Sequence, residues 1–271
     1  MASSRKFLSL FNGLLAAGVL IVGACSTVPE TGRKQLMLVS PDQESKMGLA
    51  SFEEIKKQEK ISQDPEFNAR VRRVGERIAQ SVGRELDNAQ WEFVVFESDQ
   101  INAFALPGGK VGVYTGLLKL AKSDDELACV MGHEIAHVTS RHGAERTSQN
   151  YAVAGAGIIA ALAMEAKDVD PAKRNMVLAA YGVGTTGLII LPFSRTHESE
   201  ADSIGLRFAA GAGYDPRAAV TFWQRMSAAN RGAKPPEWLS THPSDETRIK
   251  NLQALAPQYM SLYEASKTRY Q

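Results

Sequence analysis

The chain has 271 residues, a length that suits one large domain or two small ones. Hydrophobic residues make up 44% and charged residues 23%, which is the ordinary balance of a globular protein with a buried core. The formal net charge of +1 indicates neither a nucleic-acid partner nor a polybasic surface for membrane binding.

The N-terminal residues have the pattern of an export signal. Arg5 and Lys6 precede an apolar run that ends in small residues. The sequence VGACS at Val22–Ser26 resembles a bacterial lipobox, in which the cysteine is acylated and becomes the new N-terminus. A plain signal peptide or an uncleaved anchor helix is the alternative. We expect a lipoprotein signal peptide over residues 1–24, an acyl group on Cys25 and a polar tether over residues 25–40.

Acylation of Cys25 would place the mature chain in a bacterial cell envelope. Ser26 after the acylated cysteine permits sorting to the outer membrane, so we expect a lipid-anchored protein at the outer membrane that faces the periplasm. The other cysteine, Cys129, stands among apolar residues and is interpreted as a small core residue. We therefore expect no disulfide framework.

Helix patterns outnumber strand patterns along the rest of the chain. Residues 91–96 (WEFVVF) and 110–114 (KVGVY) favour strands. Ser123 and Glu126 form a capping box at the start of a strong helix, which we expect to end near Gly143. The predicted fold class is α+β, mainly helical. Other helices are expected at about 41–59, 65–83 and 195–211, after Asp215-Pro216, and near 244–255.

The region from Tyr151 to Phe193 is rich in alanine, glycine and isoleucine and is divided by a charged bridge. Residues 151–164 are too few for a membrane span, and residues 176–193 contain glycines and a threonine pair. Two interpretations stay open. We favour helices packed in a soluble core; the alternative is a membrane-associated hairpin.

The strongest chemical signal is the sequence HEIAH at residues 133–137. On a helix, His133 and His137 lie one turn apart on the same face, so both imidazoles can reach one Zn²⁺. Glu134 can lean over the metal's open position and take a proton from water. Histidines buried only for packing are the alternative, but buried titratable groups without a partner are costly.

The third protein ligand decides the class of site. A structural zinc has four protein ligands, whereas a catalytic zinc keeps one position for water. The extended motif HExxHxxGxxH is absent, because Ser140 and Gly143 stand where it requires glycine and histidine. We interpret the nearby His142 as a solvated or capping residue.

A carboxylate from a second helix is the other source of a third ligand. Glu198 and Asp202 are four residues apart and share one helical face, whereas Glu200 is turned away from it. We predict Glu198 as the ligand, with Glu200 in reserve. Asp202 would accept the free N–H of a ligand histidine and fix its tautomer.

Four features together resemble the M48 family of zinc metallopeptidases and span residues 102–248. They are HEIAH, the ExxxD spacing of Glu198 and Asp202, the segment NAFALPGG from Asn102, and His242-Pro243 followed by Arg248. The resemblance implies a zincin-like fold with a small sheet, an HExxH active-site helix and Glu198 as third ligand. The sequence TGRKQL from Thr31 is similar to the start of the periplasmic lipoprotein members, and clear spanning helices are missing.

The resemblance also implies how a substrate is held. The segment Asn102, Ala103, Phe104 and Ala105 is similar to the edge strand beside the zinc, where an extended peptide can bind through main-chain hydrogen bonds. An ordinary loop before the Gly-Gly turn is the alternative.

The roles of His242 and Arg248 stay open at this point. A donor near the metal would stabilise the oxyanion that forms during peptide hydrolysis, and we favour this catalytic role. His242 would act oppositely if it occupied the open zinc position and held the enzyme inactive. A capping histidine and a surface arginine are the third interpretation.

Together these features predict a zinc metalloendopeptidase with one Zn²⁺ per chain, in a domain over residues 41–271. Glu134 acts as general base and then as proton donor. The polypeptide substrates are expected to be misfolded or unassembled envelope proteins, as the resemblance implies. The alternatives are an envelope assembly factor or chaperone with little proteolysis, and a structural zinc protein. We expect attachment to a membrane through the lipid anchor and no nucleic-acid partner.

Overall fold

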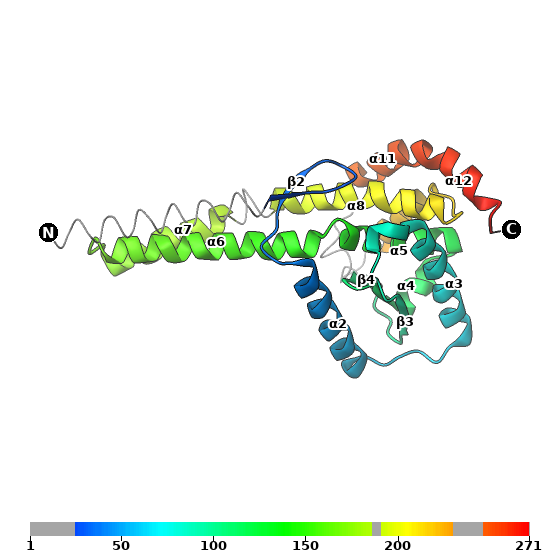
Figure 1. Cartoon of the computed structure of the whole chain (residues 1–271), viewed down its shortest axis with the longest axis horizontal. Coiled ribbons are helices and arrows are strands. Elements are labelled where there is room, and N and C mark those ends of the chain that lie inside the picture. The colour runs from blue at the N-terminus through cyan, green and yellow to red at the C-terminus, as the bar shows by residue number, and fades with distance from the viewer. Residues whose placement is uncertain (1–24, 186–190, 230–245, 271) are drawn as a thin grey trace. The chain divides into compact units, whose positions relative to one another are not determined.

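The computed structural model describes residues 25–185, 191–229 and 246–270 (Figure 1). These residues are mainly helical and form two small sheets, which confirms the predicted α+β class. The chain divides into two compact units. The larger unit combines residues 41–141 with 193–271, and the smaller unit combines residues up to Ser40 with 142–192. The domain expected over 41–271 is thus interrupted by a segment that groups with the N-terminal residues.

The larger unit contains the longer sheet and most of the helices. Its elements are α2 (Pro41–Gln58), α3 (Pro65–Val82), the 3₁₀ helix η1 (Gly83–Leu86), β3 (Glu92–Phe96), β4 (Ala103–Leu106), β5 (Lys110–Tyr114), α4 (Thr115–Leu120), α5 (Asp124–Thr139), α8 (Leu191–Gly211, whose first two residues belong to the smaller unit), α9 (Ala218–Ala229), α11 (Glu246–Leu255), η3 (Ala256–Tyr259) and α12 (Met260–Lys267). The sheet has the order β3-β5-β4, with β3 parallel and β4 antiparallel to the central strand β5.

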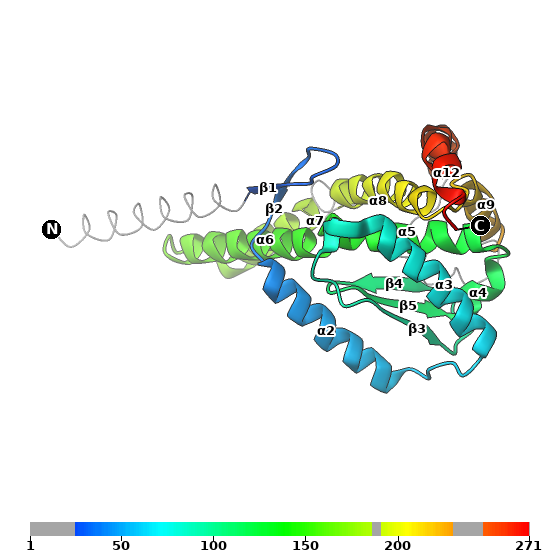
Figure 2. The ribbon, with the colours of Figure 1, turned by 45° about the vertical axis from the view of Figure 1, so that its right-hand side comes forward.

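Helices cover both faces of this sheet because successive strand residues point to opposite sides. Ala103 and Val113 are buried in the main core, together with residues of α3 and α5. Their neighbours Phe104 and Tyr114 point the other way and form a second cluster with Phe52 of α2. The sheet therefore lies between α2 on one side and α3 with α5 on the other (Figure 2).

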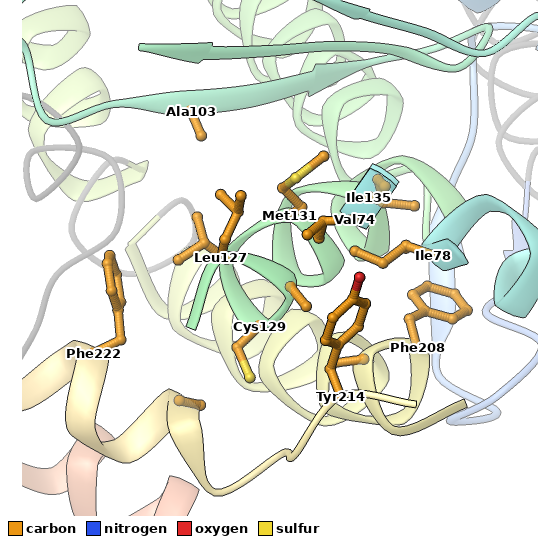
Figure 3. Packing of buried hydrophobic residues seen from close by; sticks show 14 of the residues in the cluster. Val74, Ile78, Ala103, Leu127, Cys129, Met131, Ile135, Phe208, Tyr214 and Phe222 are labelled. Carbon is orange, nitrogen blue, oxygen red and sulfur yellow. The ribbon is translucent and has the colours of Figure 1, made fainter. Parts of the chain in front are cut away.

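The main core is built around α5. Figure 3 shows Met131 and Ile135 of this helix beside Val74 and Ile78 of α3. These four side chains and Leu127 of α5 are at most 1% exposed. Complete burial of such a side chain contributes about 1.5–3 kcal/mol relative to its exposure to water. Packing against the sheet and α3 therefore holds α5 firmly in place.

The start of α5 agrees with the sequence, but two details differ. Ser123 Oγ accepts a hydrogen bond from Glu126 N (3.2 Å), as predicted for the cap. The Glu126 carboxylate accepts from Lys122 N (2.6 Å), one residue before the expected partner. The helix ends at Thr139 rather than near Gly143, because Arg141, with φ 55°, adopts the left-handed conformation that reverses the chain.

The smaller unit contains β1 (Cys25–Thr27), β2 (Lys34–Leu36), α6 (His142–Glu165) and α7 (Pro171–Thr185). Strands β1 and β2 pair antiparallel, and β2 packs on α6. Arg33 donates two hydrogen bonds, of 2.8 and 2.7 Å, to the Glu145 carboxylate of α6, and Glu145 is 1% exposed. Within residues 25–40, for which the sequence predicts a polar tether, Cys25–Thr27 and Lys34–Leu36 thus form a β-hairpin that packs on α6.

Helices α6 and α7 form an antiparallel pair with little burial. Tyr181 Oη donates to Val153 O (2.9 Å), and the Tyr181 ring lies beside Gly157. None of the residues of α7 is buried. The favoured prediction of helices packed in a soluble core is therefore wrong for α7. Within the described part of the chain, we find no helix whose length and apolarity would let it cross a membrane.

Candidate metal centre

Two helices of the larger unit, α5 and α8, bring the candidate ligands together. They meet where Gly132 faces Gly205. A methyl group on Gly205 would lie 2.7 Å from His133 N, and one on Gly132 would lie 2.7 Å from the Gly205 carbonyl oxygen. Only residues without a side chain permit this approach of two backbones. Because the contact lies at His133, it brings the histidines of α5 within reach of acidic residues on α8.

His133, His137 and Glu198 form a three-residue group suited to a metal ion. The Nε2 atoms of the two histidines are 3.1 Å apart. Glu198 Oε2 lies 3.5 Å from His133 Nε2, and Glu198 Oε1 lies 3.4 Å from His137 Nε2. The structure thus brings together the three ligands that the sequence predicted.

These separations fit a tetrahedral zinc site. With metal–ligand bonds of about 2.0–2.1 Å, ligand atoms at tetrahedral corners are about 3.3 Å apart, close to the separations in the structure. The donor types also fit, because two imidazole nitrogens and one carboxylate are an ordinary ligand set for catalytic zinc.

Asp202 orients the first histidine. Its Oδ1 lies 3.0 Å from His133 Nδ1, so His133 can donate the Nδ1 proton and keep Nε2 for a metal. Burial and the Arg248 charge lower the pKa of His133, but hydrogen bonds to Asp202 and Glu198 outweigh them and raise it to about 9. The pKa of Asp202 is lowered: burial raises it, but the Arg248 charge and the hydrogen bond with His133 act more strongly together.

Arg248 holds the two carboxylates in place. Its Nη1 donates to Glu198 Oε2 (2.8 Å), and its Nε and Nη2 donate to the two oxygens of Asp202 (2.9 and 2.7 Å). The guanidinium carbon lies 3.7 Å from the centre of the Trp223 ring on α9. Arg248 is 7% exposed, so the alternative of a surface arginine is wrong. The structure places it as a positioning residue for Glu198 and Asp202 rather than as a donor facing a substrate.

The remaining sequence candidates lie in different places. Glu134 is buried (5% exposed) and follows His133 on α5. Glu200 is also buried but does not belong to the three-ligand group. His142 is 2% exposed at the start of α6, which corrects its interpretation as a solvated residue. His242 lies outside the described residues.

The segment predicted to bind substrate is a strand at the edge of the described sheet. Strand β4 pairs with β5 alone among the described strands and packs on α5. Asn102 O accepts a hydrogen bond from Tyr114 N (3.0 Å) just before the strand begins. Ala103 is buried and Ala105 packs against the core, whereas the Phe104 ring packs against Phe52. The main chain of β4, rather than its side chains, is therefore the part suited to bind a peptide.

Sequence reasoning did not find Gly132, Gly205 or Trp223. Glycine is common in this chain, and nothing in the sequence distinguishes the two that meet at the helix crossing. Trp223 stands among ordinary core residues of α9 and is recognisable as a support for Arg248 only in three dimensions.

Comparisons with known proteins agree with this arrangement. The model of Peptidase family M48 matches residues 65–256. The chain is 34% identical to the mitochondrial metalloendopeptidase OMA1 of Schizosaccharomyces pombe, over 97% of this chain and 76% of that protein. It is 33% identical to the human metalloendopeptidase OMA1, over 94% of this chain and 51% of that protein. It is 34% identical to a putative beta-barrel assembly-enhancing protease of Vibrio cholerae, over 90% of this chain and 50% of that protein.

The match to the family model covers most of the chain and includes every described residue of the candidate centre. The chain spans about half the length of the human and Vibrio cholerae relatives, and about three quarters of the Schizosaccharomyces pombe protein. All three are named as proteases. The chain therefore belongs to peptidase family M48 and is a metallopeptidase of that family.

Proposed function

We propose that the chain is a zinc-dependent endopeptidase that hydrolyses misfolded or unassembled proteins of a bacterial cell envelope. The observation that carries this proposal is the group of His133, His137 and Glu198, with ligand atoms spaced for a tetrahedral metal site. Three protein ligands leave the fourth position to water or substrate, as catalytic zinc requires. This supports catalysis over a structural zinc with four protein ligands.

One zinc ion per chain is the proposed cofactor. When bound, it polarises a carbonyl oxygen and makes water more acidic. Glu134 then takes a proton from the attacking water and delivers it to the leaving amine. Asp202 keeps the His133 tautomer, and Arg248 keeps the Glu198 carboxylate in position.

The proposed substrate is an extended segment of polypeptide. The edge of β4 offers main-chain hydrogen-bonding groups next to α5, and pairing with them would give affinity without strict sequence preference. Such tolerance suits a peptidase that acts on unfolded chains. The name of the Vibrio cholerae relative refers to beta-barrel assembly, which favours clients in an envelope.

The location is also a proposal. The sequence VGACS at Val22–Ser26 supports a lipid anchor on Cys25 in the outer membrane. Relatives are named as bacterial assembly-enhancing proteases and as mitochondrial peptidases. Incorporation of labelled fatty acid into the wild type but not into Cys25→Ala would support the anchor. Labelling of Cys25→Ala, or none of the wild type, would refute it.

The central test compares Glu134→Gln with wild type on casein as an unfolded substrate. We expect retained zinc and a loss of activity of about 10²–10⁴, the usual contribution of a general base. The matched control is Glu54→Gln, which changes an exposed residue of α2 and should leave zinc content and activity unchanged. Nearly full activity of Glu134→Gln would refute the proton-transfer role.

The same variant tests the substrate class in cells. An inactive enzyme that still binds clients should retain envelope proteins after cross-linking, and these proteins should be degraded by the wild type. An assembly factor with little proteolysis predicts the opposite, because its effect on the envelope would persist in Glu134→Gln.

A further inference from the structure

The pair α6–α7 exposes large apolar side chains to solvent. We use the name hairpin face for Ile158, Ile159 and Leu162 of α6 with Met176 and Val183 of α7, which are between 55% and 76% exposed. At 3.6 residues per turn, Ile158 and Leu162 lie about one turn apart on one side of α6. Met176 and Val183 are likewise about two turns apart on one side of α7. Several large apolar side chains exposed on one pair of packed helices indicate an interaction site.

The charge of the hairpin argues against a strongly acidic or basic partner. Residues 142–185 contain four basic and four acidic side chains, so their formal charges cancel. Six of these eight charges lie between Glu165 and Arg174, at the connection between the helices. Residues 151–164 and 175–185 carry none. The occupant of the hairpin face must therefore be recognised through apolar contact.

The uncharged stretches are too short to cross a bilayer. Residues 151–164 span about 21 Å as a helix at 1.5 Å per residue, whereas the hydrocarbon core is about 30 Å thick. A transmembrane orientation would also place the charged connection inside the hydrocarbon. An uncharged helix pair of this length that exposes apolar side chains can instead lie parallel to the membrane surface and bury those side chains at the interface.

The proposed acylation site belongs to the same unit as the hairpin. Cys25 is the first residue of β1, which pairs with β2, and β2 packs on α6. The ion pair between Arg33 and buried Glu145 connects the loop before β2 to α6. The predicted export segment over residues 1–24 ends immediately before Cys25. An acyl chain on Cys25 would thus hold the base of α6 at a membrane surface.

We propose that the hairpin face binds a lipid bilayer at its interface and forms a second membrane contact beside the acyl anchor. The hairpin adds apolar burial to the attachment that the acyl anchor gives. Its formal charges cancel, so its binding should not depend on anionic lipid. This inference rests on the lipid anchor proposed above and goes beyond it.

The test uses the acylated full chain in phosphatidylcholine vesicles, with a polarity-sensitive fluorophore on one introduced cysteine. Leu162→Cys places the probe in the hairpin face, and Met47→Cys places it on α2, where Met47 is 55% exposed. Cys25 carries the acyl group, and Cys129 is buried, which raises the pKa of its thiol and prevents labelling. Brominated lipid should quench the Leu162→Cys probe at least about twofold more than the Met47→Cys probe, because an interfacial helix sinks about 5–10 Å into the headgroup boundary.

A second variant separates membrane contact from misfolding. Ile158→Asn with Ile159→Asn should remove the quenching of a probe at Met176→Cys, while peptidase activity on casein and zinc content stay at wild-type values. Equal quenching of the Leu162→Cys and Met47→Cys probes would overturn the proposal. Energy transfer between labelled copies without lipid quenching would also overturn it, and would show that a second copy covers the face.

The outcome for the anchor is read separately. If fatty acid does not enter the wild type, the anchor is refuted. The probe variants are then made in the full chain together with Cys25→Ser, and quenching of the probe is measured after vesicles are added. Quenching at Leu162→Cys would still support the hairpin contact in that case. Its absence would refute both membrane contacts while leaving the peptidase activity as an independent result.

Discussion

The contact of Gly132 with Gly205 permits a sharp test of how the metal centre is assembled. In Gly205→Ala, the new methyl carbon would lie 2.7 Å from His133 N, 2.8 Å from His133 Cα and 3.0 Å from the Gly132 carbonyl carbon. All three are backbone atoms of α5, a helix fixed by the main core. No rotation of a side chain can relieve the contact, so α8 must move away from α5.

The required movement can be worked out from these distances. Ordinary van der Waals contact begins at 3.4 Å, so relief of the 2.7 Å contact needs a separation of about 0.7 Å. Metal–ligand bonds tolerate deviations of about 0.2 Å. Glu198 lies on α8 and the two histidines on α5, so this shift stretches the ligand set beyond that tolerance. We expect zinc affinity to fall at least about tenfold, since loss of a supporting partner alone costs about 10–100-fold.

Stability is the weaker measure of this change. Overpacking costs about 1–3 kcal/mol, but replacement of glycine by alanine in a helix regains about 1 kcal/mol. The two effects partly cancel, so the melting temperature could change little while the site is damaged. The decisive assay is therefore a zinc dissociation constant, measured by competition with a chelator of known affinity.

Gly155→Ala is the matched control. Gly155 lies inside α6 with no atom within 4 Å of an added methyl group. We expect unchanged zinc affinity and a gain in stability of up to about 1 kcal/mol. If Gly205→Ala binds zinc with the wild-type dissociation constant, the close crossing of α5 and α8 does not assemble the centre.

Three further predictions concern the site and the smaller unit. Asp202→Asn should weaken zinc binding about 10–100-fold because the amide supports His133 less well. Glu200→Gln is the control in a zinc titration, and equal dissociation constants for the two variants would contradict this prediction. Arg33→Ala should lower the free energy of unfolding by about 3–5 kcal/mol, because removal of one partner of a buried ion pair is strongly destabilising; a denaturation midpoint like that of wild type would oppose it. Free zinc at about 100 times its dissociation constant should stabilise the wild type by about 2.7 kcal/mol, and thermal melting of His133→Ala should show no such response.

Local patterns predicted the elements that carry the chemistry. The strands over 91–96 and 110–114 correspond to β3 and β5, and the helix that begins after Ser123 is α5. The spacing within HEIAH sets the relation of His133 to His137 for any α-helix. Each of these features depends on residues within a few positions of one another, so alternation, capping and helical periodicity were enough.

Features that join distant segments required the tertiary structure. The place of Arg248 on α11 is one example, because it contacts Glu198 and Asp202 of α8 and Trp223 of α9. The sequence left Arg248 between a catalytic and a surface role, whereas the structure shows it holding the carboxylates. The β-hairpin at Cys25 is another, since its polar residues resemble a tether until Arg33 meets Glu145 on α6.

The exposure of α7 and the crossing of α5 with α8 likewise required the tertiary structure. Apolar composition does not say whether a helix faces a core, a membrane or solvent, and it wrongly favoured a core for α7. A glycine in the sequence does not reveal which backbone will approach it. The sequence alone determined the ligand types and their spacing on α5, because these are local properties of one helix. Only the tertiary structure decided how closely Glu198 approaches them, because that distance depends on which surfaces pack when the whole chain folds.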